Sequence, residues 1–191
     1  MKIDPELVEA STAESSYVAL FDAHFADIWR FARRRCDSSH DADDVTAETF
    51  AVAWRRHDDV PVGEARLWLF GVARRVIANH QRTIDRQDNL RLRLAETAGR
   101  ESPPDAARES SGAVREALAA LPPDDRELLI MRAWDELSVK EMAIVLGSSP
   151  NAVSLRLYKA RRKLAHELKR KESQGSGHVA GGSPSTEEGS S

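Results

Sequence analysis

Apolar residues recur every three or four positions along most of the sequence, which is the spacing of one face of an α-helix. The pattern predicts long helices at about 15–35, 41–56 and 65–86, followed by a series of shorter helices between 113 and 168. With 191 residues and 41% hydrophobic content, the chain can fill modest cores but not one large core. We therefore predict an all-α protein with two small helical domains, 15–95 and 113–172.

Three polar stretches flank and separate these domains. Residues 1–14 have no apolar period, and residues 173–191 are rich in Gly and Ser, so both ends are predicted to be disordered. Residues 96–112 combine Pro, Ser, Gly and charged residues, which is the composition of a flexible linker. The candidate functional residues all lie inside the two domains.

A tightly capped pair of helices stands near the end of the second domain. Ser138 lies three residues before Glu141, the spacing of a capping box, and Gly147 falls where a helix commonly ends in a left-handed residue. Ser149 can cap the next helix, and Pro150 fits its first position, where no N–H is needed. The spacing predicts two helices separated by about three residues, as in a helix-turn-helix.

The second helix of this pair has two different faces. Val153, Leu157 and Ala160 recur at helical spacing and predict a narrow buried stripe. The opposite face and its flanks carry Asn151, Ser154, Leu155, Arg156, Tyr158, Lys159 and Arg162. Asn, Tyr, Lys and Arg reach base edges and phosphates when a helix lies in a major groove. The plainer alternative is a solvated charged face on an ordinary helical hairpin, but the capped turn favours DNA binding.

Charge is polarised along the chain, although the formal net charge is only −3. Between residues 138 and 172, nine Lys and Arg residues outnumber three Glu residues. The acids concentrate elsewhere, notably at Asp41, Asp43, Asp44 and Glu48. This distribution predicts an anionic partner at one end and a different partner at the other.

The sequence also limits the compartment and the chemistry. No stretch approaches the roughly 20 apolar residues of a membrane span, and the N-terminus lacks the basic and apolar regions of a signal peptide. We therefore expect a cytoplasmic protein. The single cysteine, Cys36, excludes an internal disulfide and a cysteine-rich zinc site, and we expect it in the core.

Two carboxylates, Asp44 and Glu48, lie one helical turn apart on the predicted second helix. Such a pair can be a set of metal ligands or an acid and base pair, but no histidine follows either residue at i+3. A surface for a basic protein partner fits better. We therefore expect no enzyme activity, no metal, no cofactor and no small-molecule substrate.

The third helix changes character halfway along its length. Its first half, around Trp68 and Phe70, is almost wholly apolar and should be buried. Its second half is basic and hydrogen-bonding, with Arg74, Arg75, Asn79, His80, Arg82 and Arg86. Aromatic rings that stack on bases and arginines that bind phosphates would grip single-stranded DNA. Alternatively the rings are ordinary core residues, which we favour for Phe70 and leave open for Trp68.

Four segments in this order, 20–34, 41–56, 65–82 and 117–164, resemble bacterial sigma factors of the extracytoplasmic-function group of the sigma-70 family. These small sigma factors have only the second and fourth conserved regions. The resemblance covers about residues 17–168, nearly all of the predicted ordered chain. It implies that residues 15–95 are region 2, which binds core RNA polymerase and the −10 element, and that 113–172 are region 4, which binds the −35 element.

The resemblance also implies roles for the candidate residues of region 2. The D-x-x-x-E-x-F-x-x-x-W helix of the family, which docks on the β′ clamp helices of the polymerase, is matched by Asp44, Glu48, Phe50 and Trp54. The loop after it captures a base flipped from the −10 element; here it contains His57, Asp58 and Asp59. The −10 strand is further bound by the next helix, matched by Trp68, Arg74, Arg75, Asn79, His80 and Arg82. The family often has Asn at position 75 and Asp at position 79, a departure that bears on −10 specificity and not on −10 binding.

In region 4 the resemblance places Ser154, Leu155, Tyr158 and Lys159 at positions that read the −35 element. The family often has a small polar residue where Leu155 stands, and an apolar side chain there can contact a thymine methyl group. The implied partners are core RNA polymerase, through the β′ clamp helices and the β flap, promoter DNA and an anti-sigma factor.

Two other functions remain as alternatives. A self-sufficient helix-turn-helix regulator would use the first domain for dimerisation or sensing, and would bind a symmetric operator without polymerase. A helical-bundle enzyme built on residues 41–48 would need a nucleophile, a base and a ligand set that the sequence lacks.

Overall fold

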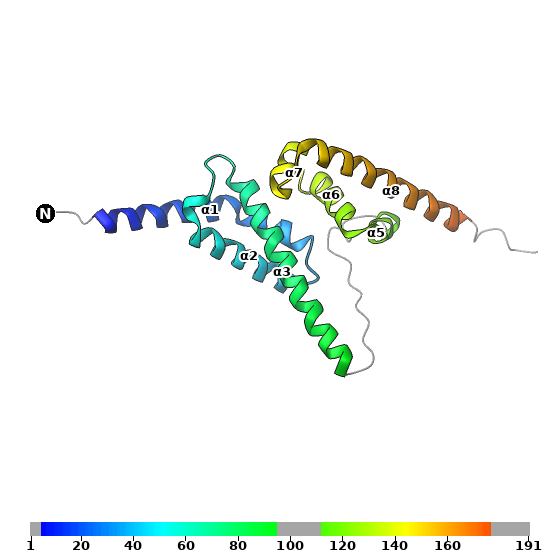
Figure 1. Ribbon diagram of the computed structural model, residues 1–191, viewed down its shortest axis with the longest axis horizontal. Helices are drawn as coiled ribbons and strands as arrows, with labels where there is room; N and C mark the ends of the chain where they lie inside the picture. Colours follow the sequence, from blue (N-terminus) through cyan, green and yellow to red (C-terminus); the bar gives the residue numbers. More distant parts are fainter. Residues whose placement is uncertain (1–4, 95–111, 177–191) are drawn as a thin grey trace, which may run out of the picture.

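The computed structural model describes residues 5–94 and 112–176, and these are helices joined by turns and short loops, without strands (Figure 1). The first domain contains α1 (Pro5–Arg33), α2 (Ser39–Arg55), the short 3-10 helix η1 (His57–Asp59) and α3 (Ala65–Leu94). The second domain contains α5 (Gly112–Ala119), α6 (Pro123–Ala133), α7 (Val139–Leu146) and α8 (Pro150–Ser176). The predicted all-α class is confirmed.

The core of the first domain lies among α1, α2 and α3, which pack on one another in all three pairings. Phe31 of α1 stacks on Phe70 of α3, with ring centroids 4.6 Å apart, and both rings are fully buried. Cys36 is buried beside this core, and burial raises the pKa of its thiol to about 11. Phe70 is therefore a core residue, as predicted, and Cys36 is an unreactive one.

The second domain is organised around the predicted helix-turn-helix. Ser138 and Glu141 form the capping box, with the Ser138 N–H donating to the Glu141 carboxylate at 2.7 Å. Gly147 ends α7 with φ of 59°, a left-handed conformation that glycine adopts without steric cost. Ser149 accepts a hydrogen bond from the backbone N–H of Ala152 at 3.2 Å and so caps α8. Both helix ends lie where the capping residues predicted them.

Several predicted boundaries differ from the structure. α1 already begins at Pro5, so the predicted disorder of residues 1–14 is wrong from that residue onward; Pro suits the first turn of a helix. α6 likewise begins at a proline, Pro123. α8 continues to Ser176, past the predicted start of the tail at residue 173, because the residues before the tail are strong helix formers. The rest of the tail and the predicted linker, except Gly112, lie outside the described residues.

The two domains are in direct contact, since α7 packs on α3. Gly71 of α3 faces Val145 of α7: a Cβ at Gly71 would lie 3.7 Å from the Val145 carbonyl oxygen. No helix in the described ranges is long and apolar enough to cross a bilayer. The positions of the functional side chains are thus set by two small helical bundles that contact each other through α3 and α7.

Ser138→Ala should lower the free energy of unfolding by about 1 kcal/mol, because one end of α7 loses its side-chain cap. Urea titration followed by circular dichroism measures the change. Ser148→Ala, in the turn beyond the other end of α7 and outside the capping box, is the control. Equal stability of Ser138→Ala and the wild type would show that the capping box contributes nothing.

Candidate nucleic-acid and polymerase interfaces

The outward face of α8 is exposed, as the sequence predicted. Leu155 and Tyr158 are 55% and 57% exposed, so both side chains are available to a partner. The Arg162 guanidinium lies 5.9 Å from the Tyr158 ring centroid and adds positive charge beside the ring. The other predicted residues on this side are exposed, or half-buried in the case of Arg156: Asn151, Ser154, Arg156 and Lys159. The face therefore offers apolar, hydrogen-bonding and cationic groups together.

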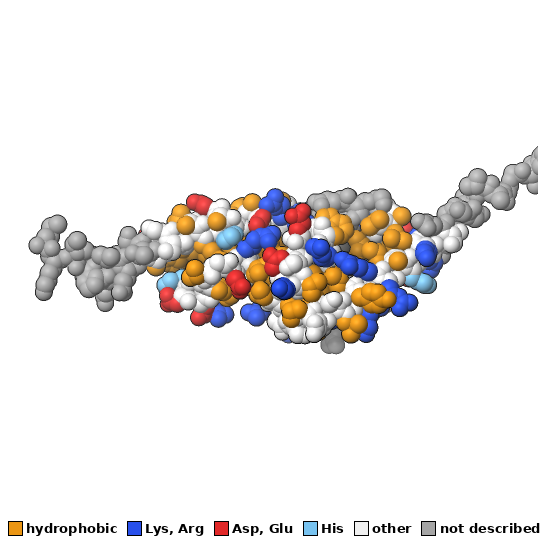
Figure 2. All heavy atoms as spheres, turned by 90° about the horizontal axis from the view of Figure 1, so that it is seen from above, with side chains coloured by type: hydrophobic (Ala, Val, Ile, Leu, Met, Phe, Trp, Pro, Cys, Tyr) orange, Lys and Arg blue, Asp and Glu red, His pale blue; other side chains and the backbone are white. Residues whose placement is uncertain are grey.

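The charges on α8 are divided between its two sides. On the side toward α5 and α6, Lys163 pairs with Asp125 and Lys171 pairs with Glu116 at 2.6 Å. Lys159 and Arg162 have no acidic partner among the described side chains. Figure 2 shows Lys and Arg dominating the half of the molecule that holds α8, whereas the acidic side chains gather over the other half. The outward face is thus free to bind an anion.

A second exposed surface lies on α2, and its charge is opposite. Asp44 and Glu48 point into solvent, with Glu48 accepting a hydrogen bond from Arg55 at 3.0 Å. Trp54, at the end of the same helix, is 47% exposed, and its ring packs edge-on against Tyr17 at 5.0 Å. This surface therefore joins two carboxylates to one large aromatic ring.

Phe50 does not belong to that surface. It is only 2% exposed and lies 4.7 Å from Phe21, measured between ring centroids. The Tyr17 hydroxyl donates to the Phe50 carbonyl oxygen at 3.2 Å and ties α1 to α2. The predicted contact of Phe50 with polymerase is therefore corrected: this residue holds the exposed face of α2 in place from inside the core.

The candidate residues of α3 separate into one stripe and two outliers. At about 100° per residue, Trp68, Arg75, Asn79 and Arg82 fall within a sector of about 60°. Arg74 and His80 lie about 120° away from Trp68, on opposite sides. Trp68 is half-buried under the Arg56 guanidinium at 5.9 Å, while Arg75, Asn79 and Arg82 are exposed. The stripe can hold a single strand along α3.

His80 is turned toward α2. Its Nε2 lies 3.2 Å from a carboxylate oxygen of Asp41, and the same carboxylate accepts the Ser38 hydroxyl at 2.7 Å. Ser38 in turn caps α2 by accepting from the Asp41 N–H. The Ser38 hydrogen bond, aided by His80, holds the pKa of Asp41 below its ordinary value. His80 therefore joins two helices, a role that the sequence did not indicate.

Asp41→Asn should lower the free energy of unfolding at pH 7 by about 1 kcal/mol, since a charge-assisted hydrogen bond is lost. Because the pKa of Asp41 is depressed in the folded state, its contribution is complete above the unfolded pKa of about 3.9 and disappears as pH falls through the folded pKa. Urea midpoints of the two proteins should therefore differ at pH 7 and converge only once the pH is below the depressed pKa of folded Asp41. A difference that persists in acid would contradict this role.

The loop after α2 borders a cavity that the sequence did not predict. His57, Asp58 and Asp59 are exposed, and Asp59 pairs with Arg56 at 2.8 Å. Beside them lies a cavity of about 460 Å³, lined by the loop and by the Tyr17 side of α1. Its walls are mostly apolar, and Val62 at the loop tip is fully exposed. The volume and lining suit a flat ring such as a base.

Comparison with known proteins shows the family of this chain. Residues 20–87 match the Sigma-70 region 2 family, and residues 111–164 match Sigma-70, region 4. The ECF RNA polymerase sigma factor SigL of Mycobacterium tuberculosis is 31% identical over 81% of this chain and 90% of its own length. The ECF sigma factor BldN of Streptomyces coelicolor is 30% identical over 85% of this chain, but this chain spans only 65% of BldN. The structure of CnrH in complex with the cytosolic domain of CnrY matches with a TM-score of 0.61 and 27% identity, over 87% of this chain and 99% of that one.

The chain belongs to the ECF sigma factors of the sigma-70 family. It is an alternative RNA polymerase sigma factor, which directs transcription initiation and is not an enzyme.

Proposed function

We propose that this sigma factor works through three surfaces. The α2 surface of Asp44, Glu48 and Trp54 docks on the β′ clamp helices of core RNA polymerase. The α3 stripe of Trp68, Arg75, Asn79 and Arg82, with the cavity beside the 57–64 loop, holds the melted −10 strand. The outward face of α8 reads the −35 element in the major groove, while region 4 rests on the β flap.

The observation that supports this proposal best is the separation of opposite charges onto two exposed helices of one chain. Carboxylates on α2 suit a basic protein surface, whereas the unpaired cations of α8 suit phosphates. On α8 the exposed Leu155 gives a contact for a thymine methyl group, and Asn151 gives hydrogen bonds to bases.

Each surface alone is expected to bind weakly. Once region 2 is docked on polymerase, region 4 meets the −35 element at a high effective concentration. The overall affinity for the promoter therefore exceeds the affinity of either surface alone. Specific promoter binding should therefore require the holoenzyme. We propose that the protein acts in the cytoplasm, where promoter DNA and polymerase are found.

An anti-sigma factor is the proposed regulator. CnrH, the matched structure, is in complex with the cytosolic domain of CnrY. By analogy, a protein of that kind would cover surfaces of this chain that polymerase needs. The exposed apolar groups on α2 and at the loop tip, Trp54 and Val62, are contacts of the type that such a partner buries.

Size-exclusion chromatography with light scattering tests the proposal, with the protein run alone and after mixing with core polymerase. We expect a monomer that shifts entirely into a one-to-one complex with core. A dimer that does not bind core polymerase would support the self-sufficient regulator, in which the first domain mediates dimerisation.

A further inference from the structure

The basic side chains of α8 form two sets, which differ in whether an acid of region 4 pairs with them. Ion pairs hold the first set: Arg156, Lys163, Arg170 and Lys171. No acidic partner exists among the described residues for the second set: Lys159, Arg161, Arg162 and Lys169. Measured around the helix from Tyr158 at about 100° per residue, the unpaired cations lie within about 100° and the paired cations at about 120° or more. Pairing therefore leaves cations free only on the outward side of the helix.

One flank of α8 carries Lys159 and, one turn further along, Lys163. A helix in a major groove turns its outward face toward the base edges, so its flanks lie beside the phosphates of the two strands. Lys159, Arg162 and Lys163 line one hollow of about 540 Å³ beside the turn between α5 and α6. A phosphate bound by Lys159 would therefore lie within reach of the flexible Lys163 side chain.

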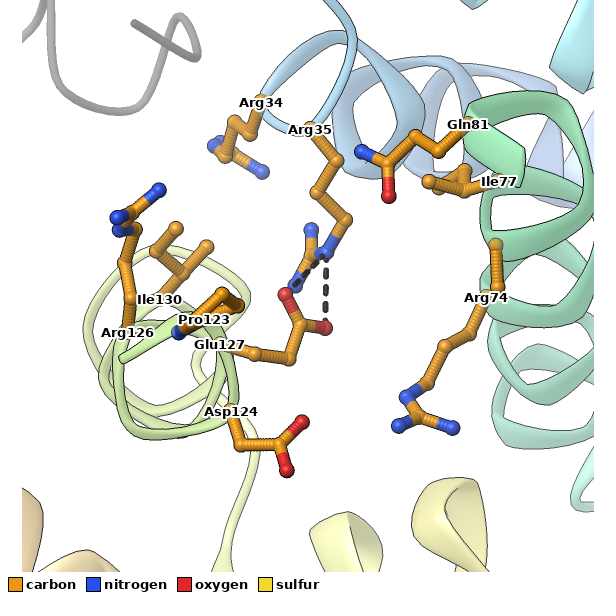
Figure 3. Close-up of a pocket in the computed structure, with 11 residues that line it drawn as sticks. Arg34, Arg35, Arg74, Ile77, Gln81, Pro123, Asp124, Arg126, Glu127 and Ile130 are labelled. Carbon is orange, nitrogen blue, oxygen red and sulfur yellow. Dashed lines mark hydrogen bonds and ion pairs between the residues drawn. The ribbon is translucent and has the colours of Figure 1, made fainter. Parts of the chain in front are cut away.

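Two acids in the first turn of α6 attract the cations of this flank. Asp125 accepts a hydrogen bond from Lys163 Nζ, and its side chain is only 15% exposed. Asp124 lies 3.9 Å from Arg156 Nη2. Figure 3 shows the Asp124 carboxylate turned away from the Glu127 carboxylate, which belongs to a separate ion pair. Asp125 thus binds Lys163 directly, and Asp124 is free to attract Arg156.

Free cations on this flank would raise the affinity for DNA of any sequence. Each phosphate that a Lys or Arg neutralises releases counterions, which steepens the slope of log affinity against log salt concentration by about 0.9. Such contacts carry no sequence information. A lysine that is paired with a carboxylate must lose that pair before it binds a phosphate, and the carboxylate itself repels the phosphate. The acids of α6 therefore oppose backbone binding without touching the side chains that face the bases.

We propose that Asp125, assisted by Asp124, keeps Lys163 and Arg156 from binding the DNA backbone, and so limits the sequence-independent affinity of region 4. This inference rests on the proposed function, since it takes the outward face of α8 as the DNA-binding face. The unpaired cations place α8 in the groove, and the choice of site then depends on base contacts such as that of Tyr158.

Anisotropy titrations of holoenzyme with duplex DNA test this role, at several salt concentrations and with a matched or a scrambled −35 element. Asp125→Asn should raise affinity about 5- to 10-fold at about 0.1 M salt on both DNAs, and should steepen the salt slope by about one, because one more phosphate is neutralised. Glu116→Gln is the matched control. It removes the same charge and frees Lys171 of the same helix, but Lys171 lies about 140° from Tyr158, so affinity and slope should equal those of the wild type. A gain of affinity cannot result from a variant that fails to fold.

Lys163→Gln separates a released cation from a general effect of charge. Alone it should leave affinity unchanged, because Lys163 makes no phosphate contact in the wild type; combined with Asp125→Asn, it should abolish the gain. No gain for Asp125→Asn, an equal gain for Glu116→Gln, or a loss for Lys163→Gln as large as that for Lys159→Ala would each overturn the role of Asp125. A Lys159→Ala holoenzyme that keeps the wild-type salt slope would instead refute the proposed contact of α8 with DNA.

Discussion

Glu48→Arg should reduce affinity for core RNA polymerase at least about 30-fold while leaving the fold intact. Replacing one partner of a desolvated interfacial charge pair costs roughly 2 to 5 kcal/mol, and each 1.4 kcal/mol is a factor of ten. Glu48 is exposed, and its bond to Arg55 is a surface pair of little weight for stability. The effect should therefore appear in binding and not in unfolding.

Fluorescence anisotropy of labelled protein titrated with core measures this loss. Asp22→Arg, a matched charge reversal at an exposed position of α1, is the control and should bind normally. Thermal unfolding of both variants should match that of the wild type. Normal binding by Glu48→Arg would remove α2 from the polymerase interface.

Tyr158→Ala should weaken holoenzyme binding at the −35 element by about 1 to 3 kcal/mol, or roughly 5- to 150-fold. The ring is 57% exposed on α8 and supports both base contact and the neighbouring Arg162. Because the side chain lies outside the core, stability should hardly change. The loss of affinity should be larger on a promoter with the matched −35 sequence than on one with a scrambled −35 sequence.

Lys159→Ala is the contrasting variant. Loss of a phosphate contact should weaken binding to all sequences about equally, and should reduce the slope of log affinity against log salt concentration by about one. Filter binding with promoters that differ only at −35 separates the two behaviours. Equal losses on matched and scrambled −35 elements would assign Tyr158 to the phosphate backbone and not to base recognition.

Local signals made much of the second domain predictable. The caps of α7 and α8 depend on residues within three or four positions of each helix end, and Ser138, Gly147 and Ser149 lie where they were expected. The exposed face of α8 followed equally from helical spacing. Its opposite stripe is buried, with Val153 and Ala160 fully so.

Contacts between distant segments were less predictable. Phe50 shares a helix with Asp44 and Glu48, and only the packing of Phe21 and Phe25 against it shows that it points inward. The contact of His80 with Asp41 could not be predicted from spacing, because the two residues are 39 positions apart.

The seam between the domains has no sequence signature at all. The pairing of Arg35 with Asp135 spans 100 residues, and charged residues at the end of one helix ordinarily remain in solvent. A periodic pattern reports which face of a helix is apolar. It does not report which charged residue of another domain will meet it.

Transcription from a pool of random promoter sequences, with purified protein and core RNA polymerase, tests the central claim most directly. We predict initiation only when both are present, at promoters that share one −35 and one −10 element at a fixed spacing. The protein without polymerase should select no DNA from the pool. Selection of a symmetric site by the protein alone, with no initiation on adding core, would contradict the account.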